Sequence, residues 1–431
     1  MKVLSLFDGM ACGALALMSA GVEIESYDAF EIDKYAVKTS SHNFPFIKHH
    51  GDVFKADFTQ FEGVDLVCGG SPCTYWSIAQ KNNRETVASG LGWELFSQYV
   101  RAVKEAKPKF FIYENNKSMS KAIRQSIDET FGFEAVLINS ALVSAQNRQR
   151  LYWVGRRNED GTYSKVNVEQ PEDRGIVLRD ILESGVVDRE KSYPLLVSHQ
   201  GNARDYFKKQ HAQIVCEPVR IPPYGNEDKA RPLNALYPNN CGGFEHRMFS
   251  ENPNKQQVDM VAEPIYVGEL PEHKGVYRNG KQPSQQYRVY SIDGKSVACD
   301  RDSRKYVSEP IPVFATVCEW DEDGKPIKAV STADGKVYTV YEVKDGFITI
   351  KGKKYPIKLK DGYYIIRKLT VRECMRLQTV PEWYEFPVSD SQAYKMLGNG
   401  WTVEVIAHLV NSCLSDNGEA QLKIGEQMRL F

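Results

Sequence analysis

The sequence lacks the features that mark secreted, membrane-bound and zinc-binding proteins. Its nine cysteines are scattered and odd in number, and no two of them form a Cys-x-x-Cys pair. This spacing fits reduced thiols better than a disulfide framework or a zinc site. No apolar run approaches the length of a membrane span, and residues 1–10 do not have the layout of a signal peptide. We therefore expect a cytoplasmic protein without a metal site or a membrane contact.

The sequence also lacks an excess of charge of either sign. It has 55 Lys and Arg residues against 56 Asp and Glu residues, a net charge of −1 at pH 7. Any nucleic-acid partner must therefore bind to a local basic surface. The best candidate is residues 351–360, which contain five lysines and no acid. They could contact phosphates, or they could form a solvated edge strand that its lysines protect from aggregation.

The chain does contain a regular succession of short apolar segments, each followed by small or acidic residues. Its 431 residues suggest two or three domains, and a content of 42% hydrophobic and 26% charged residues indicates a globular protein. We predict strands at residues 2–7 and 27–31, a third strand before Gly51, and further strands at 64–68 and 109–113. This pattern favours an α/β fold with a parallel sheet.

An acidic residue lies at or directly after the end of each of the first three predicted strands, namely Asp8, Glu31 and Asp52. Such positions meet at the edge where α/β sheets bind ligands. Glu31 could accept hydrogen bonds from both ribose hydroxyls, and Asp52 from an adenine amino group. The turn after the first strand has no Gly-x-Gly-x-x-Gly spacing and Asp8 would repel a phosphate, so we predict a nucleoside without phosphates and disfavour a nicotinamide oxidoreductase. Each acid taken alone could instead be a solvated loop residue.

Residues 69–77, GGSPCTYWS, form the loop after the fourth predicted strand and place Cys73 at the same edge of the sheet. Gly69 and Gly70 allow a tight turn and a close approach to a ligand, and Pro72 restricts the backbone before Cys73. A thiol in this position could act as a nucleophile where positive potential favours the thiolate. Alternatively, Cys73 is a packed residue, as free cysteines often are.

Glu114 follows the predicted strand at 109–113, and the sheet should place it near Cys73. It could instead be the N-cap or a first-turn acid of a helix within residues 118–130. Further on, Arg148 and Arg150 alternate on one face of an extended segment, which suits the binding of an anion or a carboxylate. Alternatively, these two arginines belong to a solvated strand edge.

The chain contains, in this order, the segments LFDGMACG, FEID, GDV, GGSPC, YENN, QNRQR and MLGNGWTVEVIAHLV. This series resembles the ordered motifs of the DNA cytosine-5 methyltransferases over about residues 1–157 and 368–415. The segments LFDGMACGALAL and SGLGWELFSQYVRAV look closest to the animal de novo branch, although phage and bacterial relatives share much of them. The chain departs from the family pattern after Cys73, at Asn116 and at Gly400, and none of these changes removes a reacting group.

The resemblance implies a reaction and the residues that perform it. Cys73 would attack carbon 6 of a cytosine flipped out of duplex DNA, and Glu114 would hold the ring nitrogen N3 and the amino group. Carbon 5 would then take the methyl group of S-adenosylmethionine, leaving S-adenosylhomocysteine, while Arg148 and Arg150 would orient the base or the cysteine loop. The implied cofactor-binding residues are Phe7, Asp8, Gly9, Ala11, Gly13, Glu31, Ile32, Asp52, Val53, Ser71, Pro72, Asn399, Trp401 and Thr402.

We predict a Rossmann-like S-adenosylmethionine-dependent methyltransferase domain that is interrupted by an inserted β-rich domain. Residues 1–157 and 368–431 would form the methyltransferase domain, with a final helix at 402–412 and a tail at 416–431. Residues 158–367 contain seven Asp-Gly or Asn-Gly pairs, which are strong hairpin signals. By the same resemblance, this inserted region would recognise the target sequence in DNA.

Several alternatives stay open at this level. The same fold could methylate cytosine in RNA, or it could be a catalytically silent DNA-binding regulator, although Cys73, Glu114 and Arg150 are intact. We expect a monomer, and the target sequence and any restriction partner stay open. The peptide from Gln427 to Phe431 resembles the clamp-binding peptide of bacterial DNA-associated proteins, so a sliding clamp is a second candidate partner. Alternatively, this end of the chain folds back onto its own core.

Overall fold

The computed structural model describes residues 1–77, 84–195, 206–208, 213–220, 266–269, 288–290 and 314–416. These residues form two compact units. The first consists of the described residues of Met1–Glu217, Tyr341–Gly362 and Ile366–Phe431, and the second of those of Pro218–Val340 and Tyr363–Ile365. The domain boundaries after residues 157 and 367 stay a prediction, and the described residues of 158–217 belong to the first unit. The predicted tail at 416–431 lies outside the described residues except for Asp416.

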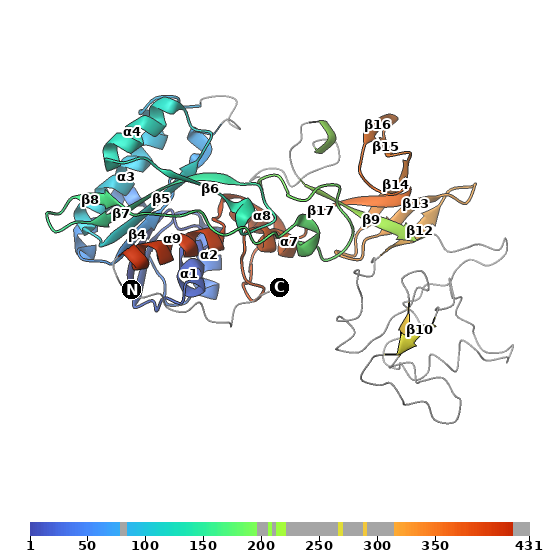
Figure 1. Cartoon of the computed structure of the whole chain (residues 1–431), viewed down its shortest axis with the longest axis horizontal. Helices are drawn as coiled ribbons and strands as arrows, with labels where there is room; N and C mark the ends of the chain where they lie inside the picture. The colour runs from blue at the N-terminus through green and yellow to red at the C-terminus, as the bar shows by residue number, and fades with distance from the viewer. Residues whose placement is uncertain are drawn as a thin grey trace, which may run out of the picture. The chain divides into compact units, whose positions relative to one another are not determined.

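An eight-stranded sheet forms the centre of the first unit (Figure 1). Its strands are β1 Lys2–Leu6, β2 Ser26–Phe30, β3 Lys48–His49, β4 Leu66–Gly69, β5 Phe110–Asn116, β6 Val136–Asn139, β7 Gln149–Arg157 and β8 Tyr163–Lys165. They run in the order β3-β2-β1-β4-β5-β7-β6, and β8 pairs with β7. Strands β1 to β5 pair in parallel, whereas β7 is antiparallel to its three neighbours. The predicted α/β class is confirmed.

The sheet contains a topological switch point between β1 and β4. The chain proceeds from β1 to β2 and β3 on one side, and the later strands β4 and β5 lie on the other side. Open α/β sheets bind their ligands beside such a point, at the carboxyl ends of the strands. The loop that begins at Phe7 follows β1, and the loop of Cys73 follows β4. The two predicted halves of the site therefore start from adjacent parallel strands.

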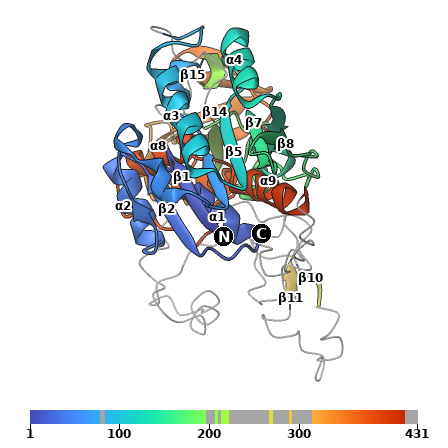
Figure 2. The same ribbon diagram turned by 90° about the vertical axis from the view of Figure 1, so that its left-hand side faces the viewer.

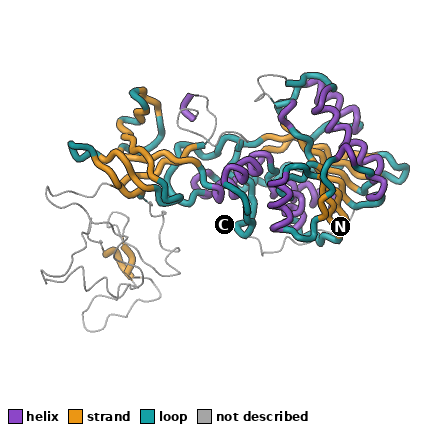
Figure 3. The backbone as a smooth tube through the Cα atoms, turned by 180° about the vertical axis from the view of Figure 1, so that it is seen from behind, coloured by secondary structure: helices purple, strands orange, loops and turns teal. Residues whose placement is uncertain are grey.

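Side chains alternate along the central strands between two cores, one on each face of the sheet. On one face, Val3 and Ile112 pack with residues of α1, α2, α7, α8 and α9; on the other, Leu4 and Phe111 pack with residues of α3 and α4. Figures 2 and 3 show these helices on both sides of the strands. The helices are α1 Cys12–Ser19, α2 Lys34–Asn43, α3 Gly90–Ala106, α4 Lys121–Phe131, α7 Val371–Leu377, α8 Asp390–Asn399 and α9 Val403–Asp416.

The closing part of the chain returns to the first helix. Helix α9, which was predicted at residues 402–412, packs against α1. Helix α7 begins with a capping box, in which Thr370 Oγ1 accepts from the Glu373 N–H and the Glu373 carboxylate accepts from the Thr370 N–H. No helix among the described residues is both long enough and apolar enough to cross a membrane.

The described part of the second unit is built from strands. Strand β12 (Ala315–Trp320) is antiparallel to β13 (Pro326–Val330), which is antiparallel to the start of β14 (Val337–Lys344). The end of β9 (Ile214–Arg220) pairs in parallel with the start of β12. Strands β10 (Tyr266–Glu269) and β11 (Arg288–Tyr290) form a separate antiparallel pair. The predicted β-rich character of this part of the chain is confirmed.

Four of the seven predicted hairpin signals lie at turns between antiparallel strands. They stand at residues 160–161, 323–324, 334–335 and 345–346, and each glycine has a positive φ. The last of these turns joins β14 to β15 (Phe347–Ile350), which pairs with β16 (Lys353–Pro356). The pair at 361–362 comes directly before the body of β17 (Gly362–Lys368). The pairs at 279–280 and 293–294 lie outside the described residues.

Candidate active site

Cys73 opens a short 3₁₀ turn, Cys73–Tyr75, directly after β4, and it is half-buried. Its carbonyl oxygen accepts hydrogen bonds from the Trp76 N–H at 3.1 Å, the Ser77 N–H at 2.9 Å and Asn116 Nδ2 at 3.3 Å. Trp76 is fully buried, and its Nε1 donates to Glu85 Oε2 at 3.0 Å. The backbone of Cys73 is therefore fixed on one side by a buried ring and on the other by a side chain of β5.

Glu114 lies within β5 and not after it, because the strand continues to Asn116. Its Oε1 is 2.9 Å from Arg150 Nε, and its Oε2 accepts from Trp401 Nε1 at 3.1 Å. The Glu114 side chain is 12% exposed. The alternative of a helix N-cap is wrong, since Ser120 caps α4 by accepting from the Ile123 N–H at 3.2 Å. Glu114 is thus an oriented carboxylate with limited access to solvent.

Gly70 allows the cysteine loop to approach Glu114. A Cβ atom at this position would lie 2.8 Å from Glu114 Oε2 and 2.9 Å from the Glu114 carbonyl oxygen. Real Cβ contacts are essentially never shorter than 3.0 Å, so a larger residue would displace either the loop or the carboxylate. Gly70 was predicted to allow a close approach to a ligand, whereas the neighbour that it approaches in the structure is Glu114.

The two residues after Glu114 hold the cysteine loop against β5. Asn115 Nδ2 donates to the Ser71 carbonyl at 3.2 Å and to Tyr113 Oη at 3.1 Å, and Ser71 Oγ lies 2.6 Å from the same Tyr113 hydroxyl. Ser71 is buried, so its hydroxyl supports the loop from within, whereas Pro72 is exposed. No role was predicted for Asn115, because its position two residues after the expected strand end at Tyr113 gave no signal of one.

The predicted pair of arginines does not share one target. Arg148 precedes β7, is buried, and donates to the carbonyls of Gly398 at 3.2 Å and Gly400 at 2.9 Å. Burial, with a smaller contribution from the charge of Arg150, lowers the pKa of Arg148 to about 10. Arg150 lies in β7 opposite Asn116, and its Nε contacts the Glu114 carboxylate. That the two arginines share a face stays a prediction, since β7 begins between them, at residue 149.

Gln378 is a positioning residue that the sequence analysis missed. Its Nε2 donates to the carbonyls of Leu397 at 2.7 Å and Gly400 at 3.2 Å, and its Oε1 accepts from Thr402 Oγ1 at 2.9 Å. Thr402 is 1% exposed, so its hydroxyl also acts inside the protein. The sequence signal that could have indicated Gln378 is its place directly after Leu377, the last residue of a helix with a buried apolar face. Gln378 orders the turn from which Trp401 reaches Glu114.

The loop after β1 has an unusual backbone. Phe7, Gly9 and Ala11 have φ values of +56°, +60° and +61°. Residues other than glycine rarely adopt this region, and each instance costs about 1–3 kcal/mol. Neighbouring segments hold the loop, because Tyr384 Oη donates to the Met10 carbonyl at 2.6 Å and the Gly9 N–H donates to Glu31 Oε2 at 2.8 Å. Strain that the surrounding structure maintains in this way often accompanies a binding site.

The three predicted acids follow β1, β2 and β3, but their surroundings differ. Asp8 Oδ1 accepts from Ser5 Oγ at 2.6 Å and Tyr27 Oη at 2.7 Å, while its Oδ2 is buried and has no hydrogen-bond partner among the described residues. Burial raises the pKa of Asp8 to about 6, although these two hydrogen bonds act in the opposite direction. Glu31 also accepts from the N–H groups that follow it, and Asp52 Oδ1 accepts from the Phe54 N–H at 3.0 Å.

The remaining predicted cofactor residues divide into exposed and packed positions. Ile32 is 77% exposed directly after Glu31, and Asn399 is exposed at the end of α8. Val53 is buried, and a Cβ atom at Gly13 would lie 2.6 Å from Tyr27 Oη. Gly13 therefore serves the packing of α1 on β2. Ile32 is a large aliphatic side chain that is exposed beside Glu31, and Glu31 is held in place by three backbone N–H groups. Such an exposed side chain suits contact with a flat, mostly apolar group.

Comparison with known proteins extends these observations. The family model of the C-5 cytosine-specific DNA methylases matches residues 1–415. The orphan methyltransferase M.SPRI of Bacillus phage SPR is 27% identical over 446 residues, which cover 94% of this chain and 95% of the phage protein. The type II methyltransferase M1.ScrFI of Lactococcus lactis subsp. cremoris is 32% identical over 203 residues, which cover 44% of this chain and 50% of that protein.

Among solved structures, a mutant of DNMT2 from Spodoptera frugiperda is similar to this chain with a TM-score of 0.48. The two chains are 14% identical, and the alignment covers 96% of this chain and 99% of the insect chain.

Proposed function

The chain belongs to the C-5 cytosine-specific DNA methylase family, and on that premise we propose that it transfers a methyl group from S-adenosylmethionine to carbon 5 of cytosine in duplex DNA. The observation that supports this most strongly is the arrangement around Glu114. A carboxylate with a fixed orientation lies beside the loop of a half-buried cysteine, and side chains of β5 support the backbone on both sides of that cysteine.

Cys73 is the proposed nucleophile. Its thiolate adds to carbon 6 of the cytosine, and the carbon 5–carbon 6 double bond supplies the electron pair that makes carbon 5 nucleophilic. After carbon 5 has been methylated, loss of its proton restores the double bond and breaks the carbon–sulfur bond. Covalent catalysis of this kind divides one difficult substitution into easier steps. Carbon 6 is inaccessible in a stacked duplex, so the base must leave the helix at a cost of a few kcal/mol.

Glu114 is the proposed partner of the cytosine ring. Negative charge develops on the ring when the thiolate adds, and a proton shared between Glu114 and ring nitrogen N3 would neutralise it. The carboxylate can also accept from the amino group of the base. Arg150 and Trp401 hold Glu114 in one orientation, so little reorganisation is needed when the base arrives. Arg148 contributes indirectly, by fixing the turn that carries Trp401.

The residues around the loop after β1 fit S-adenosylmethionine by their chemistry. The buried and unpartnered Oδ2 of Asp8 suits a cationic group, and the cofactor carries both an ammonium and a sulfonium. Glu31 and Asp52 supply acceptors for ribose hydroxyls and an adenine amino group, and exposed Ile32 supplies an apolar surface for the base. When bound, the cofactor supplies the electrophilic methyl group that carbon 5 accepts.

The proposed partner is double-stranded DNA, and we propose that the protein acts as a monomer in the cytoplasm of a bacterial or phage-infected cell. The phage and bacterial origin of its methyltransferase relatives supports this setting. The proposed contact of Gln427 to Phe431 with a sliding clamp stays a prediction, because these residues lie outside the described part of the chain.

The test is transfer of a labelled methyl group to duplex DNA, with the modified bases mapped. We expect labelled 5-methylcytosine at a short recurring sequence, and a loss of turnover of about 10⁴-fold or more in Cys73→Ser. Cys318→Ser, which changes an exposed cysteine of the second unit, is the control and should retain full activity. Undiminished turnover by Cys73→Ser would refute the mechanism, and methylation of RNA alone would refute the proposed substrate.

A further inference from the structure

One arginine of helix α3 holds the backbone of the loop that follows Asp52. Arg101 donates from Nη1 to the Ala56 carbonyl and from Nη2 to the Val53 carbonyl, both at 2.9 Å. Its guanidinium lies 4.6 Å from the centre of the Phe58 ring, in a cation–π contact. A single side chain therefore contacts three positions of the segment 53–58.

Glu105, one turn further along α3, completes this arrangement. Its Oε2 accepts from the Phe58 N–H at 3.1 Å, and its Oε1 lies 3.6 Å from Arg101 Nη1. The two side chains thus satisfy carbonyls and an N–H group of one loop. An ion pair this exposed contributes little by itself, so the hydrogen bonds to the backbone account for most of the effect.

The same loop carries Asp52 and Val53. Asp52 caps the 3₁₀ turn Val53–Lys55 by accepting from the Phe54 N–H, so the direction of its carboxylate depends on the backbone that Arg101 holds. Arg101 is also bonded to Gln98 Oε1 at 2.9 Å, which fixes the guanidinium on the surface of the helix. A change at position 101 would therefore be transmitted to Asp52 through two peptide units.

We propose that Arg101 is a positioning residue for the cofactor: it sets the affinity for S-adenosylmethionine by fixing the loop of Asp52 and Val53, without contacting the cofactor itself. This inference rests on the proposed function, since it assigns the loop to the adenosine part of S-adenosylmethionine. It separates cofactor binding from the chemistry at Cys73, because the hydrogen bonds and the cation–π contact of Arg101 go to Gln98 of its own helix and to the segment 53–58.

The experiment measures binding of S-adenosylmethionine and of S-adenosylhomocysteine by calorimetry, together with steady-state kinetics. Arg101→Gln removes the charge and one of the two carbonyl contacts, and we expect a Kd for both ligands that is about tenfold to a hundredfold higher. The kcat at saturating cofactor and the KM for DNA should change by less than about twofold. Arg101→Lys should recover part of the affinity, because an ammonium can bond one carbonyl but lacks the planar fork.

Lys104→Ala is the matched control, since Lys104 is exposed on the same helix between the two residues that hold the loop. It should bind both ligands as the unchanged protein does. Equal affinity in Arg101→Gln and the unchanged protein would overturn the inference. So would a parallel loss of affinity for cofactor and DNA with a lowered Tm, because that result indicates a general loss of structure. If Arg101→Gln does not fold, Arg101→Lys and Glu105→Gln decide by the same criteria.

The outcome also separates this inference from the proposed function. If the unchanged protein binds neither ligand, the proposed function fails and this inference fails with it. If the unchanged protein binds both ligands and methylates DNA while Arg101→Gln binds equally well, only the role of Arg101 is refuted.

Discussion

Glu114 and Glu373 of the first unit are both paired with an arginine, but they differ in how many further hydrogen bonds they receive. Glu114 accepts from Arg150 and Trp401, one contact for each oxygen, and its side chain is 12% exposed. Glu373 accepts from Nη1 and Nη2 of Arg367 and from the N–H groups of Glu183 and Thr370, and its side chain is 0% exposed. A carboxylate has about four acceptor positions, so Glu373 is saturated and Glu114 is not.

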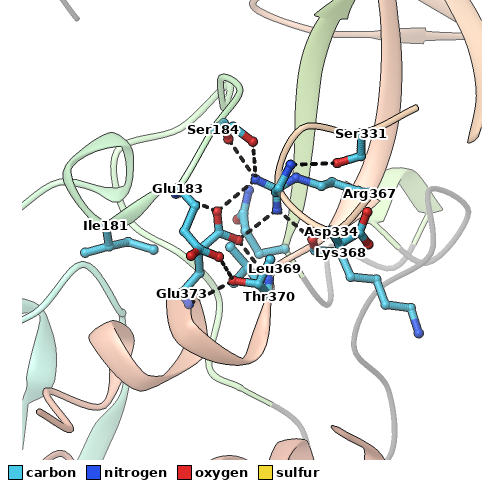
Figure 4. A network of polar contacts seen from close by, with 12 residues as sticks. Ile181, Glu183, Ser184, Ser331, Asp334, Arg367, Lys368, Leu369, Thr370 and Glu373 are labelled. Carbon is cyan, nitrogen blue, oxygen red and sulfur yellow. Dashed lines mark hydrogen bonds and ion pairs between the residues drawn. The ribbon is translucent and has the colours of Figure 1, made fainter. Parts of the chain in front are cut away.

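Figure 4 shows the surroundings of Glu373, where the guanidinium of Arg367 contacts both the Glu373 carboxylate and Ser184. Arg367 Nε also donates to Glu217 Oε1 at 2.6 Å, and its Nη2 donates to the Ser184 carbonyl at 2.7 Å. Burial alone would lower the pKa of Arg367, but the hydrogen bonds and charges of Glu373 and Glu217 raise it. This cluster joins residues near positions 184, 217 and 367–373, and each oxygen of Glu373 already accepts two hydrogen bonds within it.

The comparison distinguishes a structural ion pair from one that is available for chemistry. A saturated, buried pair can stabilise only its own conformation, and removing one partner leaves the other charge unpaired. A partly satisfied carboxylate near the surface keeps acceptor positions for an incoming base. The two pairs should therefore respond in opposite ways to substitution, one in stability and the other in turnover.

The largest effect is expected from Arg367→Met. This change leaves the carboxylates of Glu217 and Glu373 buried without their cation, and we expect the free energy of unfolding to fall by about 3–5 kcal/mol. Urea denaturation measures this loss. Arg372→Met is the control, because Arg372 lies beside Glu373 in α7, has a side chain that is 58% exposed, and pairs with Glu183 and Glu382. It should cost less than about 1 kcal/mol. Equal losses in both variants would show that burial does not distinguish the two pairs.

The next effect is expected from Glu114→Gln. The amide keeps the shape of the side chain but cannot share a carboxyl proton with ring nitrogen N3, so we expect kcat to fall by about 10²- to 10³-fold. The free energy of unfolding should change by less than about 1 kcal/mol, since Arg150 and Trp401 each keep either the amide oxygen or solvent as an acceptor. Single-turnover methyl transfer and urea denaturation measure the two quantities. A variant that loses stability but not turnover would place Glu114 with Glu373 as a structural residue.

The sequence predicted those residues of the site whose position follows from the succession of strands and loops along the chain. Cys73, Asp8 and Glu31 were found because each follows a strand of a parallel sheet, and such strand ends meet at one edge. Contacts across the fold could not be found in this way. The hydroxyl of Tyr384 bonds the carbonyl of Met10, 374 positions away, and nothing in either local sequence indicates the other.

The arginines show the same limit. Alternation predicted that Arg148 and Arg150 share a face, but it gave no sign that the two side chains have different partners. Arg150 contacts the Glu114 carboxylate. Arg148 is instead turned toward Gly398 and Gly400, which the sheet brings near it from the end of the chain. The Arg101 contacts were equally invisible, because the loop 53–58 has no regular period from which its neighbour could be predicted.

Asp8 is intermediate between Glu114 and Glu373 in the hydrogen bonding of its carboxylate, and it gives the smallest expected effect. Asp8 has one oxygen with two donors and one buried oxygen without a partner, and burial raises its pKa to about 6 from an ordinary value of 3.8. Between these two pH values the folded state binds more protons than the unfolded state, so the contribution of Asp8 to stability decreases as the pH rises through this range. Asp8→Asn keeps an oxygen for Ser5 and Tyr27 and removes the titration. We expect the stability of the unchanged protein, relative to this variant, to fall by about 1–3 kcal/mol from pH 4 to pH 7.

Asp57→Asn tests the sign of this argument. Hydrogen bonds from the side chain and backbone of Thr59 lower the pKa of Asp57, so its contribution to stability is present above its ordinary pKa and is lost as the pH falls. The difference between the unchanged protein and Asp57→Asn should therefore change with pH in the direction opposite to that for Asp8→Asn. Urea denaturation at several pH values measures both differences. If the difference in the free energy of unfolding between the unchanged protein and Asp8→Asn is independent of pH, then Asp8 Oδ2 does not lie in a low-dielectric site. The proposal that this oxygen suits a cationic group would then lose its support.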